Sequence, residues 1–366
     1  MNERIFDVED WISEYDKYRE IEKYSFRSVC YSPFTTMVFR PDGDVIPCCW
    51  NGAEVLGNVK ESSLKDIWFG DKAIDIRTSF KNYQFKKTCW ACRRLIAKDK
   101  NYWETPAYHS MMLFTPENKG YPARIEFNLS NRCNLQCIMC NGISSSSIRK
   151  FREKLPPIEM AYDKDFIRQL DEFLPYLRQA YFAGGEPFME PLNYSIWKRM
   201  VKLGYSQRIE LDITTNGTIW NKEIEDMLLT FKKIHLNASY DADQKDIFES
   251  IRIGADRDAV RENLGKISRI VNDVHTNATG SLSITPMKQN WFELPRLFKL
   301  AKELNLGITL SYCHAPEACT LDTLDKKEIK DILNYLRMNE PKDISRSKRL
   351  GEKYNNLLNS LSSQAE

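Results

Sequence analysis

The sequence lacks any long apolar run. No hydrophobic stretch in it approaches the roughly 18 residues that a membrane-spanning helix needs. The first 15 residues are acidic and amphipathic, and they lack the basic and apolar regions of a signal peptide. We therefore expect a cytoplasmic protein without a membrane partner.

An excess of charge of one sign is also missing, because 53 Lys and Arg residues stand against 51 Asp and Glu residues in a chain of 366. A dedicated nucleic-acid-binding protein usually has a marked basic excess or a basic stripe. The balance therefore argues against a nucleic-acid partner. With 42% hydrophobic and 28% charged residues the composition is that of a globular protein, and the length suggests two or three domains.

Cysteine, in contrast, is plentiful. A protein that is not exported has its thiols kept reduced, so ten cysteines favour metal binding or catalysis over a disulfide framework. They fall into three groups along the chain: Cys30, Cys48, Cys49, Cys89 and Cys92; Cys133, Cys137 and Cys140; Cys313 and Cys319.

The first third of the chain predicts a small mixed α and β region. Apolar residues at helical spacing indicate an amphipathic helix over residues 7–24. Residues 35–48 are predicted to form a β-hairpin closed by Asp42-Gly43. Helices are expected at about 63–81 and after Cys89, and residues 98–121 are expected to be irregular.

From residue 124 the pattern becomes strand, loop and helix, repeated. Helical stretches near 163–177, 190–203, 221–231, 256–273 and 291–304 separate six candidate strands, and two polar, Lys-rich helices follow over 326–366. Such alternation predicts an α/β fold with a parallel sheet or barrel. The candidate strands are 124–129, 179–182, 209–214, 233–239, 281–285 and 307–312.

The strongest chemical signal is the C-x3-C-x2-C run Cys133, Cys137 and Cys140, directly after the first of these strands. Three thiolates can hold three irons of a [4Fe–4S] cube and leave the fourth iron open. The carboxyl end of a barrel strand is where active sites lie. A zinc knuckle, or three unrelated thiols, is the alternative interpretation.

The sequence here resembles the radical S-adenosylmethionine (SAM) superfamily. The resemblance is carried by the cysteine run, by Gly184-Gly185-Glu186-Pro187 after the second strand and by Thr215-Asn216-Gly217 after the third. It implies a partial (β/α)6 barrel, a [4Fe–4S] cluster on Cys133, Cys137 and Cys140 whose open iron binds SAM, and reductive cleavage of SAM. A reductase, flavodoxin or ferredoxin would supply the electron.

The same resemblance implies a SAM-binding set. Glu186, with the backbone at Gly184 and Gly185, would bind the methionyl amino group, in keeping with the close approach that paired glycines allow. Asn216 and Ser239 would contact the ribose hydroxyls or the carboxylate, and Arg252 the carboxylate. The alternative for each is a tight turn, a solvated loop residue or a helix N-cap.

The hairpin region resembles the auxiliary-cluster module called SPASM or, when shorter, twitch. The match runs through Pro47-Cys48, Leu56-Gly57-Asn58 and the stretch from Ser63 to Trp68. It implies one auxiliary [4Fe–4S] cluster, with a zinc-stapled mini-domain as the alternative. Cys49 would be an alternative ligand or, preferably, a buried small hydrophobe. The four ligands would be Cys30, Cys48, Cys89 and Cys92.

These readings combine into a domain plan. We expect an N-terminal helix (1–26), a small α+β twitch-like domain (27–115), a radical SAM partial barrel (120–320) and a C-terminal helical extension (321–366). Cys313 and Cys319 follow the sixth strand. Cys313 would return a hydrogen atom to a substrate radical, as in epimerases of the superfamily; the preferred alternative is that both are ordinary loop residues.

The resemblance implies an enzyme that removes a hydrogen atom from a peptide or protein, giving oxidation, a crosslink or epimerisation, with the auxiliary cluster as electron acceptor. One alternative is a small-molecule dehydrogenase or rearrangement enzyme acting on a sugar or aminoglycoside-like substrate. A more distant one is a non-enzymatic iron–sulfur scaffold or electron carrier.

Overall fold

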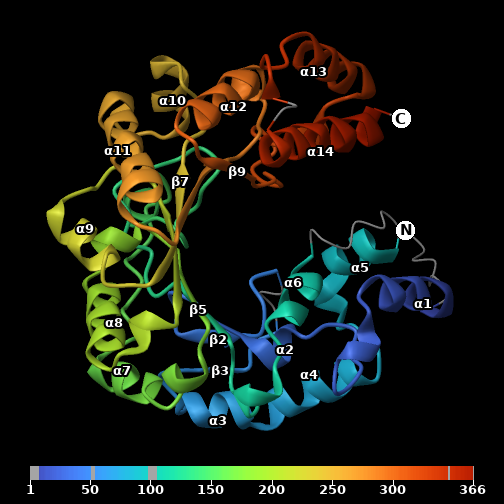
Figure 1. Ribbon diagram of the computed structural model, residues 1–366, viewed down its shortest axis with the longest axis vertical. Coiled ribbons are helices and arrows are strands. Elements are labelled where there is room, and N and C mark those ends of the chain that lie inside the picture. Colours follow the sequence, from blue (N-terminus) through green and yellow to red (C-terminus); the bar gives the residue numbers. More distant parts are fainter. Residues whose placement is uncertain (1–7, 51–53, 98–104, 345–346, 366) are drawn as a thin grey trace. The chain divides into compact units, whose positions relative to one another are not determined.

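The computed structural model describes residues 8–50, 54–97, 105–344 and 347–365. The chain divides into two compact units, the first made of Met1–Ser130 and Glu159–Tyr181 and the second of Asn131–Ile158 and Phe182–Glu366 (Figure 1). The domain limits expected from the sequence remain a prediction. Within the described ranges no helix is long and apolar enough to cross a membrane.

The strands of the first unit lie in the order β3-β2-β1-β4-β5. The predicted hairpin is confirmed, with β1 and β2 antiparallel and Gly43 in the left-handed region at φ +93°. Strand β1 also pairs in parallel with β4, where Thr36 lies opposite Arg124. The strands are β1 (Thr36–Phe39), β2 (Asp44–Ile46), β3 (Gly57–Asn58), β4 (Arg124–Phe127) and β5 (Gln179–Phe182).

The helices of the first unit differ from the prediction at three places. The opening helix ends at Tyr18, the stretch 63–81 is two helices that meet at Gly70, and residues 106–112, expected to be irregular, form a helix. The helices are α1 (Val8–Tyr18), α2 (Ser32–Thr35), α3 (Leu64–Phe69), α4 (Asp71–Lys81), α5 (Trp90–Ala97), α6 (Pro106–Met112) and α7 (Lys164–Leu170).

Local chemistry explains the correction at α6. Thr105 is its N-cap and accepts a hydrogen bond from the backbone N–H of Tyr108 at 3.2 Å, and Pro106 occupies the first turn. In α3 the cap is Ser63, which accepts from Asp66 N at 3.1 Å. Trp68 on α3 is fully buried and donates through its indole N–H to Gly120 O at 2.7 Å. These contacts fix the ends and the orientation of the helices in the first unit.

The second unit is an α/β layer built on four parallel strands in the order β6-β7-β8-β9. The mixed α/β fold with a parallel sheet is thereby confirmed. The strands are β6 (Glu210–Thr215), β7 (Lys233–Ser239), β8 (Ala278–Ile284) and β9 (Gly307–Leu310). The helices are α8 (Pro191–Lys202), α9 (Lys222–Leu228), α10 (Lys245–Ile251), α11 (Arg257–Arg269), α12 (Leu294–Glu303), α13 (Lys326–Met338) and α14 (Lys348–Ala365).

The two faces of the layer formed by these four strands differ in polarity. One face is apolar and buried, with Leu211, Ile213, Leu236 and Ala238 completely inaccessible to solvent. Side chains alternate between faces along a strand, and the strand registers align polar residues across the opposite face. That polar face carries Glu210, Asp212, Thr214, Lys233, His235, Asn237, Ser239, Thr279, Ser281, Ser283 and Thr309.

The C-terminal helices α13 and α14 pack beside one another, as the red end of the chain in Figure 1 shows, and α14 also packs against α12 and β9. Helix α13 begins with a capping box between Asp325 and Glu328. Arg349 of α14 donates to Gly280 O at 3.0 Å, and its guanidinium fills the space beside Gly307. Arg349 therefore covers the sheet near the amino ends of β8 and β9.

Candidate functional site

The loop that carries Cys133, Cys137 and Cys140 is held on one side by a run of serines. Ser145 Oγ donates to Leu135 O at 2.6 Å, Ser146 Oγ accepts from Cys133 N at 3.1 Å, and Ser147 Oγ donates to Cys133 O at 2.8 Å. No role for this serine run follows from the sequence alone. In the folded chain its hydroxyls hold the cysteine loop in place.

The other side of the loop lies along the segment that follows α10. The backbone N–H groups of Gln136 and Ile138 donate to Ile253 O at 2.8 Å and Ile251 O at 2.9 Å. These four residues flank Cys137 and Arg252. Arg252 therefore lies beside the middle of the cysteine loop. From the sequence, only its position in the chain had suggested that it belongs to the same site.

Arg252 is itself buried in an ion pair. Its Nη2 lies 2.6 Å from Asp241 Oδ2, and Asp241 Oδ1 accepts from Thr285 N at 2.7 Å. Asp241 is completely buried and Arg252 is 6% exposed. Burial acts to lower the pKa of Arg252, but Asp241 and the thiol of Cys137 outweigh it and the pKa rises. A permanent cation thus lies next to the cysteine loop.

The two glycines that precede Glu186 both have positive φ, +76° at Gly184 and +57° at Gly185. A Cβ on Gly185 would lie 2.4 Å from Arg132 O, so only glycine fits there. Glu186 N then donates to Arg132 O at 2.8 Å. This turn thus lies directly against the residue that precedes Cys133.

Glu186 is completely buried, and three donors converge on its carboxylate. Oε1 accepts from Thr215 Oγ1 at 2.8 Å and Phe188 N at 3.1 Å, and Oε2 accepts from Asn216 N at 2.7 Å. Burial raises the pKa of Glu186 to about 7, although these hydrogen bonds act in the opposite direction. About four acceptor positions exist on a carboxylate, so one is left for a ligand.

Asn216 connects Glu186 to the cysteine loop. Its Nδ2 donates to Asn134 Oδ1 at 3.0 Å and to Cys133 Sγ at 3.8 Å. Its Oδ1 accepts from Thr218 Oγ1 at 2.7 Å. Ser239 is half-buried at the end of β7 and lies opposite Ser283 in the strand register. Both predicted residues therefore lie at the carboxyl end of the sheet, as an α/β active site requires.

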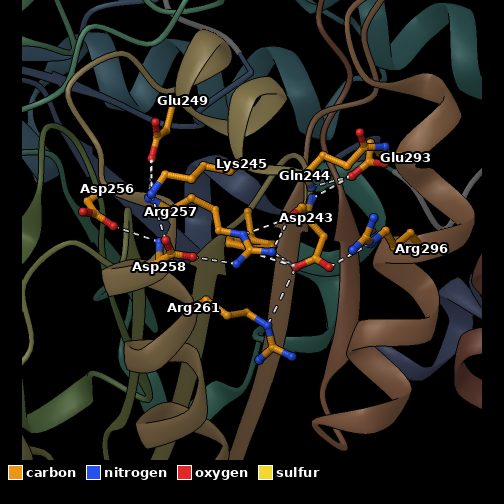
Figure 2. A network of polar contacts seen from close by, with 11 residues as sticks. Asp243, Gln244, Lys245, Glu249, Asp256, Arg257, Asp258, Arg261, Glu293 and Arg296 are labelled. Carbon is orange, nitrogen blue, oxygen red and sulfur yellow. Dashed lines mark hydrogen bonds and ion pairs between the residues drawn. The ribbon is translucent and has the colours of Figure 1, made fainter.

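A polar network fixes the loop that carries Asp241 (Figure 2). The carboxylate of Asp243 forms an ion pair with Arg296, with an N–O distance of 2.9 Å. It also lies 3.6 Å from a nitrogen of Arg257 and 3.8 Å from a nitrogen of Arg261. Glu293 accepts from the backbone N–H of Asp243 at 2.8 Å. The loop after β7 is therefore anchored to α11 and α12, which limits the freedom of Asp241.

The three thiols themselves suit a cluster. Cys133 Sγ accepts from Leu135 N at 3.5 Å besides the Asn216 amide, which is the acceptor role of a ligand thiolate. Burial raises the pKa of Cys137 to about 11, while the charge of Arg252 opposes this. In the described ranges no three Cys, His, Asp or Glu residues converge on a single metal ion. A cube does not require this, because each thiolate binds its own iron.

The four cysteines predicted to hold an auxiliary cluster all line one pocket of the first unit. Cys30 Sγ accepts from Ser32 N and Cys48 Sγ from Trp50 N, each at 3.4 Å. Burial raises the pKa of Cys30 to about 12 and that of Cys92 further. The structure therefore brings together the thiols at positions 30, 48, 89 and 92.

The preferred interpretation of Cys49 is wrong. We expected a buried small hydrophobe, but Cys49 lies in the turn after β2 and is exposed. A free cysteine is usually buried, but β2 ends at Ile46, and Cys49 lies beyond the strand in an exposed turn.

Cys313 and Cys319 are buried, 8% and 2% exposed, and pack with Ile251 and Met287. Ile138 and Met139 of the cysteine loop lie against the same cluster. The Cys313 thiol donates to Ala315 O at 3.3 Å and lines a pocket. The structure thus places both thiols beside the cysteine loop, and hydrogen donation by Cys313 stays a prediction.

Two family models match the chain over the ranges that contain the cysteines of the two predicted clusters. The SPASM family model, described as an iron–sulfur cluster-binding domain, matches residues 30–93, and the radical SAM superfamily model matches residues 127–294. The chain is similar to an AdoMet-dependent heme synthase of Methanosarcina barkeri (strain Fusaro / DSM 804), with 27% identity over 186 residues. The match covers 50% of this chain and 48% of that protein, so the chain spans about half the length of this relative.

Among solved structures, SuiB of Streptococcus suis has 14% identity and a TM-score of 0.46, covering 88% of this chain and 70% of SuiB. TYW1 with a lysine-pyruvate adduct bound has 15% identity and a TM-score of 0.38, covering 69% of this chain and 82% of TYW1.

Proposed function

Because the chain belongs to the radical SAM superfamily and carries a SPASM domain ahead of its radical SAM domain, we propose that it cleaves SAM reductively and removes a hydrogen atom from a carbon of its substrate. The observation that carries this proposal is the convergence of three elements on one loop. The Gly184-Gly185 turn, the Asn216 amide and the Arg252 segment all contact residues 132–138.

Cys133, Cys137 and Cys140 would hold the [4Fe–4S] cluster. When bound, this cluster supplies the electron that splits SAM into methionine and a 5′-deoxyadenosyl radical. The serine hydroxyls and the Ile251 and Ile253 carbonyls keep the loop in position for it. The N–H donors at Cys133 would stabilise the thiolate form of this ligand.

Two residues of the proposed SAM-binding set already use part of their hydrogen-bonding capacity within the protein. Glu186 has one acceptor position left for the methionyl ammonium, because three donors already occupy the rest. Arg252 has one Nη committed to Asp241, so a carboxylate would use its other donors; Nε has no hydrogen-bond partner among the described residues. Ser239 and Asn216 complete the set at the strand ends.

For the substrate we propose first a peptide or protein, as the combination of a SPASM domain with a radical SAM domain suggests. The auxiliary cluster, on the four thiols of the first unit, would accept the electron left on the substrate.

A specific observation favours a second candidate, a small hydroxyl-rich molecule such as a sugar. The residues on the polar face of β6 to β9 are mostly uncharged, which suits hydrogen bonding to hydroxyl groups.

The experiment is an anaerobic assay of the reconstituted protein with SAM and dithionite. We expect 5′-deoxyadenosine and methionine in equal amounts, and no 5′-deoxyadenosine would contradict the proposal. Deuterated candidate substrates then separate the two classes, since the true substrate transfers deuterium into 5′-deoxyadenosine. Transfer from a deuterated peptide supports the first candidate, and transfer from a deuterated sugar supports the second.

A further inference from the structure

The segment after the cysteine loop exposes large apolar side chains. Ile143, Phe151 and Leu155 are 52%, 53% and 47% exposed, and every residue from Lys150 to Pro157 is exposed. Exposed apolar groups gathered on a short stretch mark interaction surfaces. We call residues 142–157 the basic lobe, for the charge described next.

The basic lobe carries four cations and one anion, a net charge of 4 − 1 = +3 where the whole chain has +2. The anion, Glu153, accepts from Gly142 N at 2.8 Å, so its carboxylate is turned inward to hold the lobe. The cations are Arg149, Lys150, Arg152 and Lys154. A surface of this kind attracts an acidic partner.

The basic lobe has a defined shape. A π-helical turn, η5 (Ile148–Arg152), forms its centre. Arg149 N donates to Ser145 O at 3.0 Å and Leu155 N donates to Arg149 O at 2.9 Å. Because these bonds order the backbone before any partner arrives, docking costs less conformational entropy.

One side chain links the basic lobe to the loop of the proposed cluster. Arg152 donates through Nη1 to Cys137 O at 3.2 Å and through Nη2 to Cys140 O. Only the Arg152 side chain would therefore separate a protein bound on the lobe from the backbone of two of the three proposed cluster ligands. Electron transfer requires such closeness, because its rate falls steeply with distance.

We propose that the basic lobe is the docking surface for an acidic protein that carries one electron, of the flavodoxin or ferredoxin class. This inference rests on the proposed function, which needs an electron at Cys133–Cys140. The carrier loses one electron and the cluster gains one, and no atom is transferred. The apolar side chains supply contact area, and the four cations supply orientation and a fast encounter.

The test uses the reconstituted full chain, SAM and a purified acidic flavodoxin with its reductase, and measures 5′-deoxyadenosine. The variant is Lys150→Glu with Lys154→Glu, since neither side chain touches the cysteine loop. We expect kcat/KM for flavodoxin to fall about tenfold or more at low ionic strength. With dithionite, which needs no docking, the rate should stay within about twofold of the unaltered protein.

The matched control is Lys327→Glu with Lys330→Glu on α13, where both lysines are exposed. It makes the same change in net charge, and its kcat/KM for flavodoxin should change less than about twofold. In the unaltered protein, kcat/KM for flavodoxin should also fall as salt screens the charges. This salt series needs no variant, so a kcat/KM that does not change with salt overturns the proposal even if the double variant loses its cluster.

Equal effects of the two double variants would overturn the proposal, and so would a flavodoxin kcat/KM that does not change with salt. The proposal also fails if the lysine pair instead governs binding of an RNA oligonucleotide while flavodoxin kinetics stay unchanged. Failure of the proposed function looks different, because dithionite then yields no 5′-deoxyadenosine from any form of the protein.

Discussion

The buried carboxyl group of Glu186 should make the stability of the protein depend on pH. Its pKa rises from the ordinary 4.5 to about 7 in the folded state, with burial as the main cause. The folded protein therefore binds more protons than the unfolded chain between these two values. The contribution of Glu186 to the free energy of unfolding is fully present below about pH 4.5 and is lost as the pH rises toward 7. The change Glu186→Gln removes the titrating group and keeps the shape.

The magnitude follows from the two pKa values. Between the two pKa values the free energy of unfolding falls by about 1.4 kcal/mol per pH unit, and this slope flattens near each pKa. The unaltered protein should therefore lose about 2 kcal/mol of unfolding free energy between about pH 5.5 and about pH 7.5. Glu186→Gln should show no such contribution. The assay is urea unfolding of the cluster-free chain under reducing conditions, because bound clusters would break two-state behaviour. Parallel pH curves for the two proteins would refute the reasoning.

Three further changes test other contacts. Asp241→Asn leaves the cation of Arg252 buried without its partner, so the free energy of unfolding should fall by about 3 kcal/mol in urea; no loss would mean that the pair is not formed. Cys92→Ala should lower iron content by the auxiliary cluster while Cys49→Ala, at an exposed position, should leave it unchanged; equal losses would contradict the four-thiol pocket. Ser145→Ala should cost about 1 kcal/mol or more in thermal unfolding, because Leu135 O loses its donor; an unchanged transition would refute this role.

The fold of the second unit was predictable because its strands are buried and its helices are amphipathic. Four strands lie where the apolar runs placed them, with β8 beginning three residues early at Ala278. Helix α10 was missed, since its seven residues give too short a periodic pattern. Helix α6 was missed although Thr105-Pro106 is an N-terminal signal, because aromatic residues obscured the pattern around it.

The candidate site was predictable where the residues that act together are close in sequence. The cysteine run and the paired glycines before Glu186 are local, so motif and geometry coincide. The pairing of Arg252 with Asp241, eleven residues apart in sequence, depends on how the loop after β7 folds back. The serine run at 144–147 shows the same limit, because its hydrogen bonds to the cysteine loop arise only in the folded chain.

The central claim is that the loop of Cys133, Cys137 and Cys140 carries the SAM-cleaving cluster. The most direct measurement is 5′-deoxyadenosine formation by the reconstituted, dithionite-reduced variant with all three cysteines changed to Ala, next to a control with Cys49→Ala. We predict that the triple variant makes no 5′-deoxyadenosine and loses about four irons per chain, as one cube requires, while the control matches the unaltered protein. Continued SAM cleavage by the triple variant would contradict the account.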